Sequence, residues 1–142
     1  MADEKKFHVG VKGLIKNSDG KLLLMKEDVS NHSIPTSEYW DLPGGRMSQG
    51  ELILETLARE IEEETGITEF SEPVFKTAVI SNHEIKVEDE VLGLALFVYQ
   101  VVVAEDAIIR LSHEHLAYDW FEITEAKELL RHKYPTEFTE LL

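Results

Sequence analysis

The first third of the chain alternates short apolar stretches with turn-forming residues, which is typical of β-structure. Residues 7–16 and 21–26 are apolar, and Asn17-Ser18-Asp19-Gly20 between them is a turn sequence, so the three segments together predict a β-hairpin. The polar segment 28–38 contains a proline and predicts a loop. Residues 39–42 then predict a short strand that the following proline and two glycines end.

A helical period replaces this pattern from about residue 51 to residue 65. The glycine at position 66 suits the left-handed conformation that ends a helix. Apolar residues recur three and four positions apart, as expected for the side of a helix that faces a core. The predicted core side consists of Leu54, Leu57, Ala58 and Ile61.

The remainder of the chain predicts further strands and a second helix. The predicted strands are residues 74–80, 91–103 and 116–123, with residues 82–90 as a hairpin loop between the first two. Thr124 is a suitable N-cap for a helix over residues 125–132, and a short terminal helix is predicted within residues 135–142. Strands and helices mixed in this order indicate an α+β fold with a mixed sheet between helices. A length of 142 residues indicates a single domain, residues 1–142.

Composition narrows the classes of function. The formal net charge of −14 argues against nucleic acid or an anionic membrane as a partner, because both bind basic surfaces. It would also repel a phosphorylated small molecule unless metal ions reverse the local charge. No apolar run approaches the roughly 20 residues that span a bilayer. The absence of cysteine is compatible with a reducing cytoplasm, the compartment we expect.

The predicted helix ends on an unfavourable concentration of acids. Four of the five residues from Glu60 to Glu64 are glutamates, although a helix C-terminus carries partial negative charge. Glu60, Glu63 and Glu64 project within a sector of about 100°. Hard divalent cations such as Mg²⁺ prefer oxygen ligands and would relieve this repulsion. The pattern therefore predicts a metal site, and Arg59 is spaced to pair with the neighbouring carboxylates.

This segment resembles the Nudix box. The family's pattern is filled at every fixed position within residues 45–67, by Gly45, Glu51, Arg59, Glu60, Ile61, Glu63, Glu64, Gly66 and Ile67. So many constrained positions make the resemblance specific. It implies the Nudix fold, an α/β/α sandwich with a mixed β-sheet between helices. It also implies Mg²⁺, or alternatively Mn²⁺, as cofactor.

The resemblance assigns roles to individual residues. Glu60, Glu63 and Glu64 would coordinate the cations, the backbone carbonyl of Gly45 would approach them, and Arg59 would orient the glutamates. For Glu51 the resemblance implies a supporting carboxylate. Ser48 to Glu51 also fits a capping box at the start of the helix, and the two roles are compatible.

A second segment, residues 111–121, also matches the family. Many Nudix proteins carry Ser-x-Glu-His before an aromatic-rich strand, and here this places Glu114 as an added metal ligand or general base. The alternative is a polar loop that leads into a strand whose aromatic residues are core. His113 and His115 are expected to be loop histidines, because carboxylates suit Mg²⁺ better than imidazole does.

The resemblance implies hydrolysis of a phosphoanhydride in a nucleoside diphosphate linked to another group. A carboxylate would take the proton of the attacking water, and Glu63, Glu64 and Glu114 all remain candidates. Residues 40–45 resemble MutT-like nucleoside triphosphate pyrophosphohydrolases, which is the substrate class we expect. Residues 111–120 resemble diadenosine polyphosphate hydrolases, so a dinucleotide or nucleotide sugar is the alternative. A non-catalytic nucleotide-binding domain and a homodimer are also compatible with the family.

Overall fold

The computed structural model describes residues 3–28 and 38–142, so nearly all of the predicted loop over residues 28–38 lies outside the described residues. In chain order the elements are β1 Phe7–Lys16, β2 Leu22–Glu27, β3 Trp40–Asp41, β4 Gly44–Arg46, α1 Ile53–Thr65, β5 Val74–Ile80, β6 Ile85–Val87, β7 Glu90–Val102, β8 His115–Phe121, α2 Ile123–Leu130 and α3 Thr136–Thr139. Within the described ranges, none of the helices combines the length and the apolar character that a membrane span requires.

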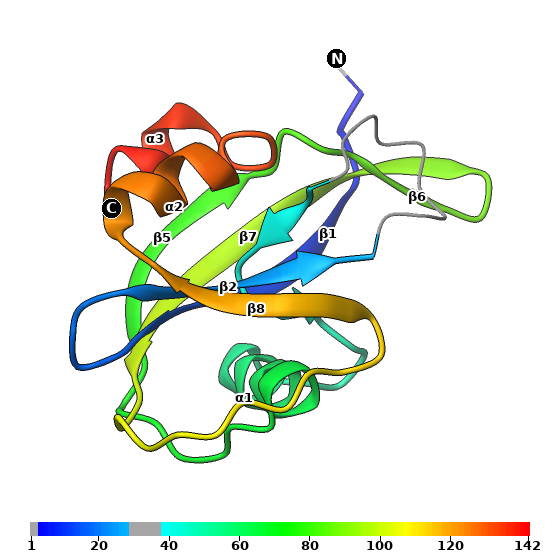
Figure 1. Ribbon diagram of the computed structural model, residues 1–142. Helices are drawn as coiled ribbons and strands as arrows, with labels where there is room; N and C mark the ends of the chain where they lie inside the picture. Colours follow the sequence, from blue (N-terminus) through cyan, green and yellow to red (C-terminus); the bar gives the residue numbers. More distant parts are fainter. Residues whose placement is uncertain (1–2, 29–37) are drawn as a thin grey trace.

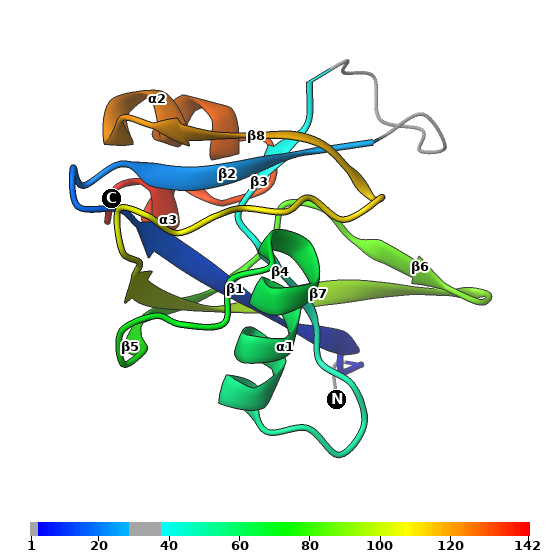
Figure 2. The ribbon, with the colours of Figure 1, turned by 60° about the horizontal axis from the view of Figure 1, so that its bottom comes forward.

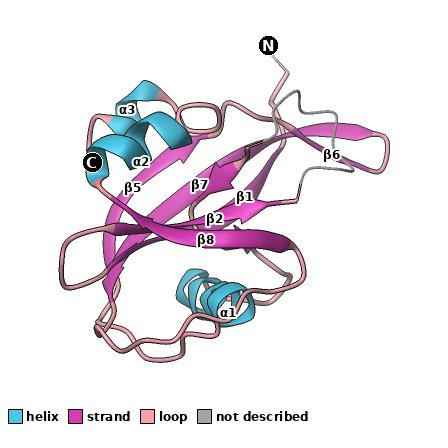
Figure 3. Ribbon diagram, viewed as in Figure 1, coloured by secondary structure: helices cyan, strands magenta, loops and turns pink. Residues whose placement is uncertain are grey.

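The strands form one mixed sheet with the order β3-β2-β1-β7-β5. Strands β1 and β7 pair in parallel over the whole length of β1, whereas the other pairs are antiparallel. Helix α1 lies on one side of the strands and helices α2 and α3 on the other (Figures 1 and 2). Figure 3 shows the same layers coloured by type of element. The predicted α+β fold, with a mixed sheet between helices, is confirmed.

The predicted hairpin between β1 and β2 forms only at its turn. Lys16 pairs with Leu22, and no further pair joins the two strands. Strand β2 pairs instead with β3 and β8. The edge of β1 that faces β2 is occupied by β4, which the sequence does not predict because the proline and glycines there indicate an end of β-structure. The sheet is therefore split between β1 and β2.

Each face of the sheet has its own core. The core beside α2 and α3 includes Leu14, Leu22, Leu24, Leu96, Val98, Leu130 and Phe138, and the core beside α1 includes Val11, Ile15, Leu23, Met25, Leu57, Ile61 and Val101. Successive residues of β2 alternate between the two cores, as the pleat of a strand requires. Both cores exclude water, so the two layers of helix are fixed on opposite faces of the sheet.

Helix α1 begins and ends where local hydrogen bonds allow. The backbone N–H of Leu52 donates to Glu55 Oε1 at 2.8 Å, and Gly66 ends the helix with φ 77°. The predicted core side is partly wrong, because Leu54 and Ala58 are exposed. Leu57 and Ile61 are buried as expected. Compared with the prediction, the helix is rotated about its axis, so that its buried side also includes Glu64. This rotation brings a metal-ligand candidate against the sheet.

Several other boundaries differ from the prediction. Helix α2 begins at Ile123 with Glu122 as its N-cap, so Thr124 is not the cap. Strand β8 begins at His115 and ends at Phe121, slightly ahead of the predicted range. The predicted hairpin loop over residues 82–90 contains the short strand β6, which pairs with β7. Strand β5 lies where predicted, β7 covers residues 90–102, and the terminal helix forms as α3.

The turn into β4 generates a prediction for stability. Gly44 has φ 143°, and a Cβ there would lie 2.1 Å from the carbonyl oxygen of Val11. Gly20 also has positive φ, at 76°, but a Cβ there would meet nothing within 4 Å. We expect Gly44→Ala to lower the free energy of unfolding by at least about 3 kcal/mol, and Gly20→Ala by about 1 kcal/mol. Urea denaturation of both variants measures this, and equal losses would contradict it.

Candidate active site

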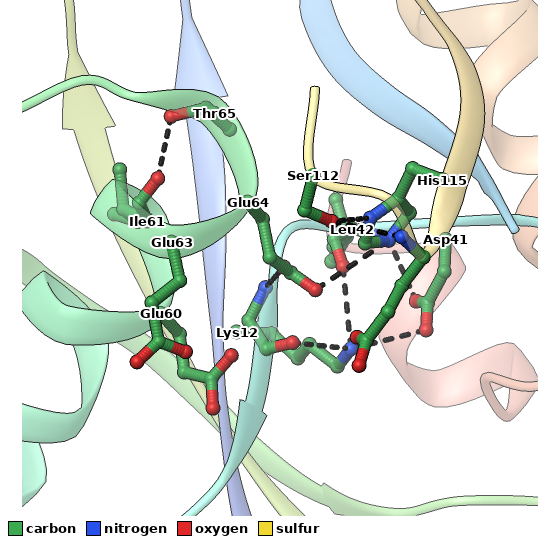
Figure 4. A network of polar contacts seen from close by, with 12 residues as sticks. Lys12, Asp41, Leu42, Glu60, Ile61, Glu63, Glu64, Thr65, Ser112 and His115 are labelled. Atoms are coloured by element: carbon green, nitrogen blue, oxygen red, sulfur yellow. Dashed lines mark hydrogen bonds and ion pairs between the residues drawn. The ribbon is translucent and has the colours of Figure 1, made fainter. Parts of the chain in front are cut away.

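A cleft of about 990 Å³ opens where the sheet splits between β1 and β2. Its lining comes from several elements far apart in the sequence, which the split brings to one place. Polar members of the lining include Lys12, Glu27, Arg46, Arg59, Glu60, Glu64, His83, Glu84, Glu114, His115 and Lys133, and apolar ones include Ile85, Leu94 and Leu96. In Figure 4 the glutamates of α1 lie on one side of Lys12. Ser112 and His115 lie on the other side.

Glu64 is the buried carboxylate of this cleft, with 11% of its side chain exposed. Its Oε1 accepts a hydrogen bond from the backbone N–H of Gly44 at 2.6 Å. Burial raises the pKa of Glu64 to about 8, although Lys12 and the Gly44 N–H act in the opposite direction. A carboxylate held in this way is poorly solvated, so a cation placed beside it would be strongly favoured.

Glu60 lies against the backbone of β4. A Cβ at position 45 would come within 2.5 Å of the Glu60 carboxylate, so a side chain there would force that carboxylate to move. Burial raises the pKa of Glu60, while Arg59 lowers it. The Arg59 guanidinium donates from Nη1 to Glu60 at 3.0 Å and to Glu63 at 3.2 Å. Glu63 has 57% of its side chain exposed and does not line the cleft.

Glu51 is joined to Arg59 by two hydrogen bonds, from Nε at 2.6 Å and from Nη2 at 3.0 Å. The pKa of Glu51 is lowered to about 2, and the hydrogen bonding by Arg59 is the largest cause. Glu51 also accepts from the backbone N–H of Ser48 at 2.8 Å. The helix begins after this turn, and Glu51 bonds Ser48 as a capping box would. Glu51 also fixes the guanidinium of Arg59, which contacts the other glutamates.

The downstream segment reaches the same cleft. Glu114 and His113 are exposed and line it. The expectation that His115 is a loop residue is wrong, because His115 opens β8 and is buried. Its Nδ1 lies 3.0 Å from Ser112 Oγ, and its Nε2 lies 3.4 Å from Glu64 Oε2. Burial lowers the pKa of His115, which favours the neutral imidazole beside Glu64.

The most buried polar group near the cleft was not found from the sequence. Asp41 is fully buried and accepts from Lys12 Nζ at 3.0 Å, Lys133 Nζ at 2.6 Å and Tyr134 Oη at 2.6 Å. Lys12 also donates to the carbonyls of Leu42 and Gly44. The available signal was a lysine inside an apolar strand and an aspartate inside a short strand. The partners of Asp41 lie as far as 93 residues away, which periodicity does not reveal.

The residues of the cleft fit a hard divalent cation. Glu60, Glu64 and Glu114 supply carboxylate oxygens, and Gly45 places no side chain against the Glu60 carboxylate. Among the described residues no three histidine, aspartate or glutamate side chains already surround one point. Arg59 holds Glu60 and Glu63, while the Gly44 N–H holds Glu64.

A family model described as NUDIX domain matches residues 6–142. Nudix hydrolase 8 of Arabidopsis thaliana is 33% identical over 122 residues, which cover 84% of this chain and 31% of that protein. The 8-oxo-dGTP diphosphatase of Proteus vulgaris is 30% identical over 67 residues, covering 47% of this chain and 56% of that protein. The chain thus spans about a third to a little over half the length of these curated relatives.

Solved structures share the fold. The MutT protein from Methanosarcina mazei Go1 superposes with a TM-score of 0.70 and 29% identity, covering 99% of this chain and 93% of that one. An Ap4A hydrolase from C. elegans superposes with a TM-score of 0.69 and 20% identity, covering 94% and 91%. The second likeness concerns the fold alone.

The Asp41 network predicts a dependence of stability on pH. Burial alone would raise the pKa of Asp41, but Lys12 and Lys133 hold it well below its usual range. Its contribution is therefore complete above the ordinary carboxyl pKa of about 4 and is lost as the pH falls below that value. We expect Asp41→Asn to lower the free energy of unfolding by about 3 kcal/mol at pH 7, because two lysines then stay buried without a counter-charge.

Urea denaturation between pH 7 and pH 3 tests this expectation. The difference between the wild type and Asp41→Asn should shrink as the pH falls below about 4. Asp19→Asn is the matched control, since Asp19 is exposed, and it should change stability little at any pH. A difference that stays constant down to pH 3 would contradict the assignment of the ionised Asp41 as the stabilising form.

Proposed function

The chain belongs to the NUDIX domain family, and on that premise we propose that it is a hydrolase of phosphoanhydride bonds in nucleoside diphosphates linked to another group. The observation that carries this proposal is the convergence of Glu60, Glu64 and Glu114 on one cleft, with Gly45 kept free of a side chain. We propose a phosphorylated nucleotide as the substrate and the cytoplasm as the compartment.

Within this class we favour a MutT-like nucleoside triphosphate pyrophosphohydrolase. The likeness to the Methanosarcina mazei MutT protein, at 29% identity over nearly the whole chain, supports it, as does the 8-oxo-dGTP diphosphatase among the relatives. A diadenosine polyphosphate or nucleotide sugar is the alternative substrate. The retention of Glu60, Glu63 and Glu64 argues against a non-catalytic, nucleotide-binding role.

Mg²⁺ or Mn²⁺ is the proposed cofactor, and Glu60, Glu63, Glu64 and Glu114 with the Gly45 carbonyl are the residues that would hold it. When bound, such an ion supplies positive charge that neutralises phosphate oxygens. Arg59 contributes by holding Glu60 and Glu63 in fixed positions, and Glu51 contributes by holding Arg59. These contacts keep like charges close together before any substrate arrives.

One carboxylate must also accept the proton of the attacking water. Glu64 is held by the Gly44 N–H, whereas Glu63 and Glu114 are exposed. Direct attack of water on phosphorus forms one P–O bond while the anhydride P–O bond breaks and the second phosphorylated product leaves, so no covalent enzyme intermediate is needed. Glutamine variants of the three residues distinguish the base from the metal ligands. Added Mn²⁺ should restore the activity of a variant that lacks a metal ligand, but not that of a variant that lacks the base.

Phosphate release from a panel of nucleotides tests the function, with Mg²⁺ and with EDTA. Pyrophosphate from nucleoside triphosphates, detected through added pyrophosphatase, is the expected result. Release only from dinucleotides or nucleotide sugars, detected through alkaline phosphatase, would favour the alternative substrate. Nucleotide binding without release from any of them would refute the hydrolase proposal.

Glu64→Gln should lower turnover by about 10²–10⁴-fold with the fold intact. Its matched control is Glu62→Gln on the same helix, which makes the same replacement at an exposed side chain that does not line the cleft. Steady-state rates with each variant, together with circular dichroism, provide the measurement. Equal activity of the two variants would remove Glu64 from the site.

A further inference from the structure

Part of the cleft wall comes from two segments that are hydrogen-bonded to each other. The loop after β5 is bonded to the turn after α2, with the N–H of Asn82 donating to the carbonyl of Lys133 at 2.7 Å and Ser81 Oγ donating to the same carbonyl at 3.2 Å. Asn82 Nδ2 adds bonds to the carbonyls of Arg131 and Tyr134, each at 3.2 Å. His83 and Lys133, which both line the cleft, are therefore held at a fixed spacing.

The Lys133 ammonium has more N–H donors than it has hydrogen-bond partners in the described residues. Its ammonium group can donate three hydrogen bonds, and within the described residues it bonds only Asp41 Oδ2. Asp41 is shared with Lys12, so two buried lysines compete for one carboxylate. Glu27, which also acts electrostatically on Lys133, makes no hydrogen bond to it in the described part of the chain. A buried ammonium with spare donors favours an anionic acceptor.

His83 offers one more donor at the same place. Tyr39 is buried, and its hydroxyl lies 3.1 Å from His83 Nδ1, with no other partner within the described residues. If Nδ1 carried the proton, the hydroxyl hydrogen would be left buried without an acceptor. We therefore assign the proton of a neutral His83 to Nε2, and Tyr39 donates to Nδ1. Burial lowers the pKa of His83, which is consistent with the neutral ring, while a hydrogen bond to the backbone of His132 acts in the opposite direction.

From this juxtaposition we propose that Lys133 and His83 form an anion subsite for a phosphoryl group of the substrate beyond the pair joined by the reacting bond. The ammonium would donate to its oxygens, and the Nε2–H, which the His132 backbone also engages, would be shared with them. This subsite would favour a chain of three or more phosphates over a diphosphate linked to a sugar. The inference rests on the proposed function, and it accounts for how a chain of net charge −14 retains a polyphosphate.

The test compares a nucleoside triphosphate with a nucleotide sugar that carries the same base. Lys133→Met should raise KM for the triphosphate about tenfold, with a smaller effect on kcat, because it removes a charged donor. His83→Ala should raise it by about threefold or more, since its donor is neutral. KM for the nucleotide sugar should change less than about twofold in both variants, because it lacks the additional phosphoryl group. Equal losses on the two substrates would overturn the assignment.

Two control variants separate the subsite from general effects. Arg131→Met removes one positive charge from an exposed side chain that pairs with Glu128, and should leave KM unchanged. Tyr134→Phe removes a hydrogen bond to Asp41 but leaves the cation, so it reports disturbance of the buried network alone. If Tyr134→Phe reproduces the effect of Lys133→Met, the role of Lys133 is structural and the proposal fails.

A binding measurement keeps the proposal independent of turnover. Inorganic tripolyphosphate and pyrophosphate are titrated calorimetrically into the protein with Mg²⁺. Wild type should bind tripolyphosphate more tightly, and Lys133→Met should remove this preference. Equal affinity of wild type for the two anions would overturn the anion subsite even if nucleotides are hydrolysed. A preference without hydrolysis would uphold the subsite and reject the proposed function.

Discussion

Asp41 is the charge on which the arrangement of this protein depends. It is fully buried between Lys12 of β1, Lys133 beyond α2 and the hydroxyl of Tyr134. Removal of ions from water costs several kcal/mol for each, so such a group persists only where its hydrogen bonds are complete. Because the partners belong to separate elements, their pairing fixes one strand, one turn and the C-terminal segment relative to one another.

The same network determines the shape of the cleft. Lys12 donates to the carbonyl of Gly44, whose N–H in turn holds Glu64. Strand β4 occupies the edge of β1 that a simple hairpin would have given to β2. The carbonyls and N–H groups of this short strand thus lie between a buried lysine and a buried glutamate. The position of β4 therefore explains both the splitting of the sheet and the placement of Glu64.

The acidic end of α1 is held by cationic side chains of the protein itself. Arg59 contacts Glu51, Glu60 and Glu63 at once, which offsets the repulsion that the helix C-terminus would otherwise increase. Lys12 has the corresponding role toward Glu64, acting through space and lowering its pKa against the effect of burial. The arrangement of these glutamates therefore depends on two cationic side chains, Arg59 on the helix and Lys12 on β1.

Periodicity along the chain was enough to predict the α+β fold and most strands to within a few residues, and the spacing of the Nudix box was enough to recognise the resemblance to the family. Long-range packing was needed for the pairing of β2 with β8, for the rotation of α1 that exposes Leu54 and buries Glu64, and for the contact of His115 with Glu64. It also set the partners of Asp41. Such contacts join residues far apart in the chain, and their energy comes from burial and charge pairing, which no local pattern records.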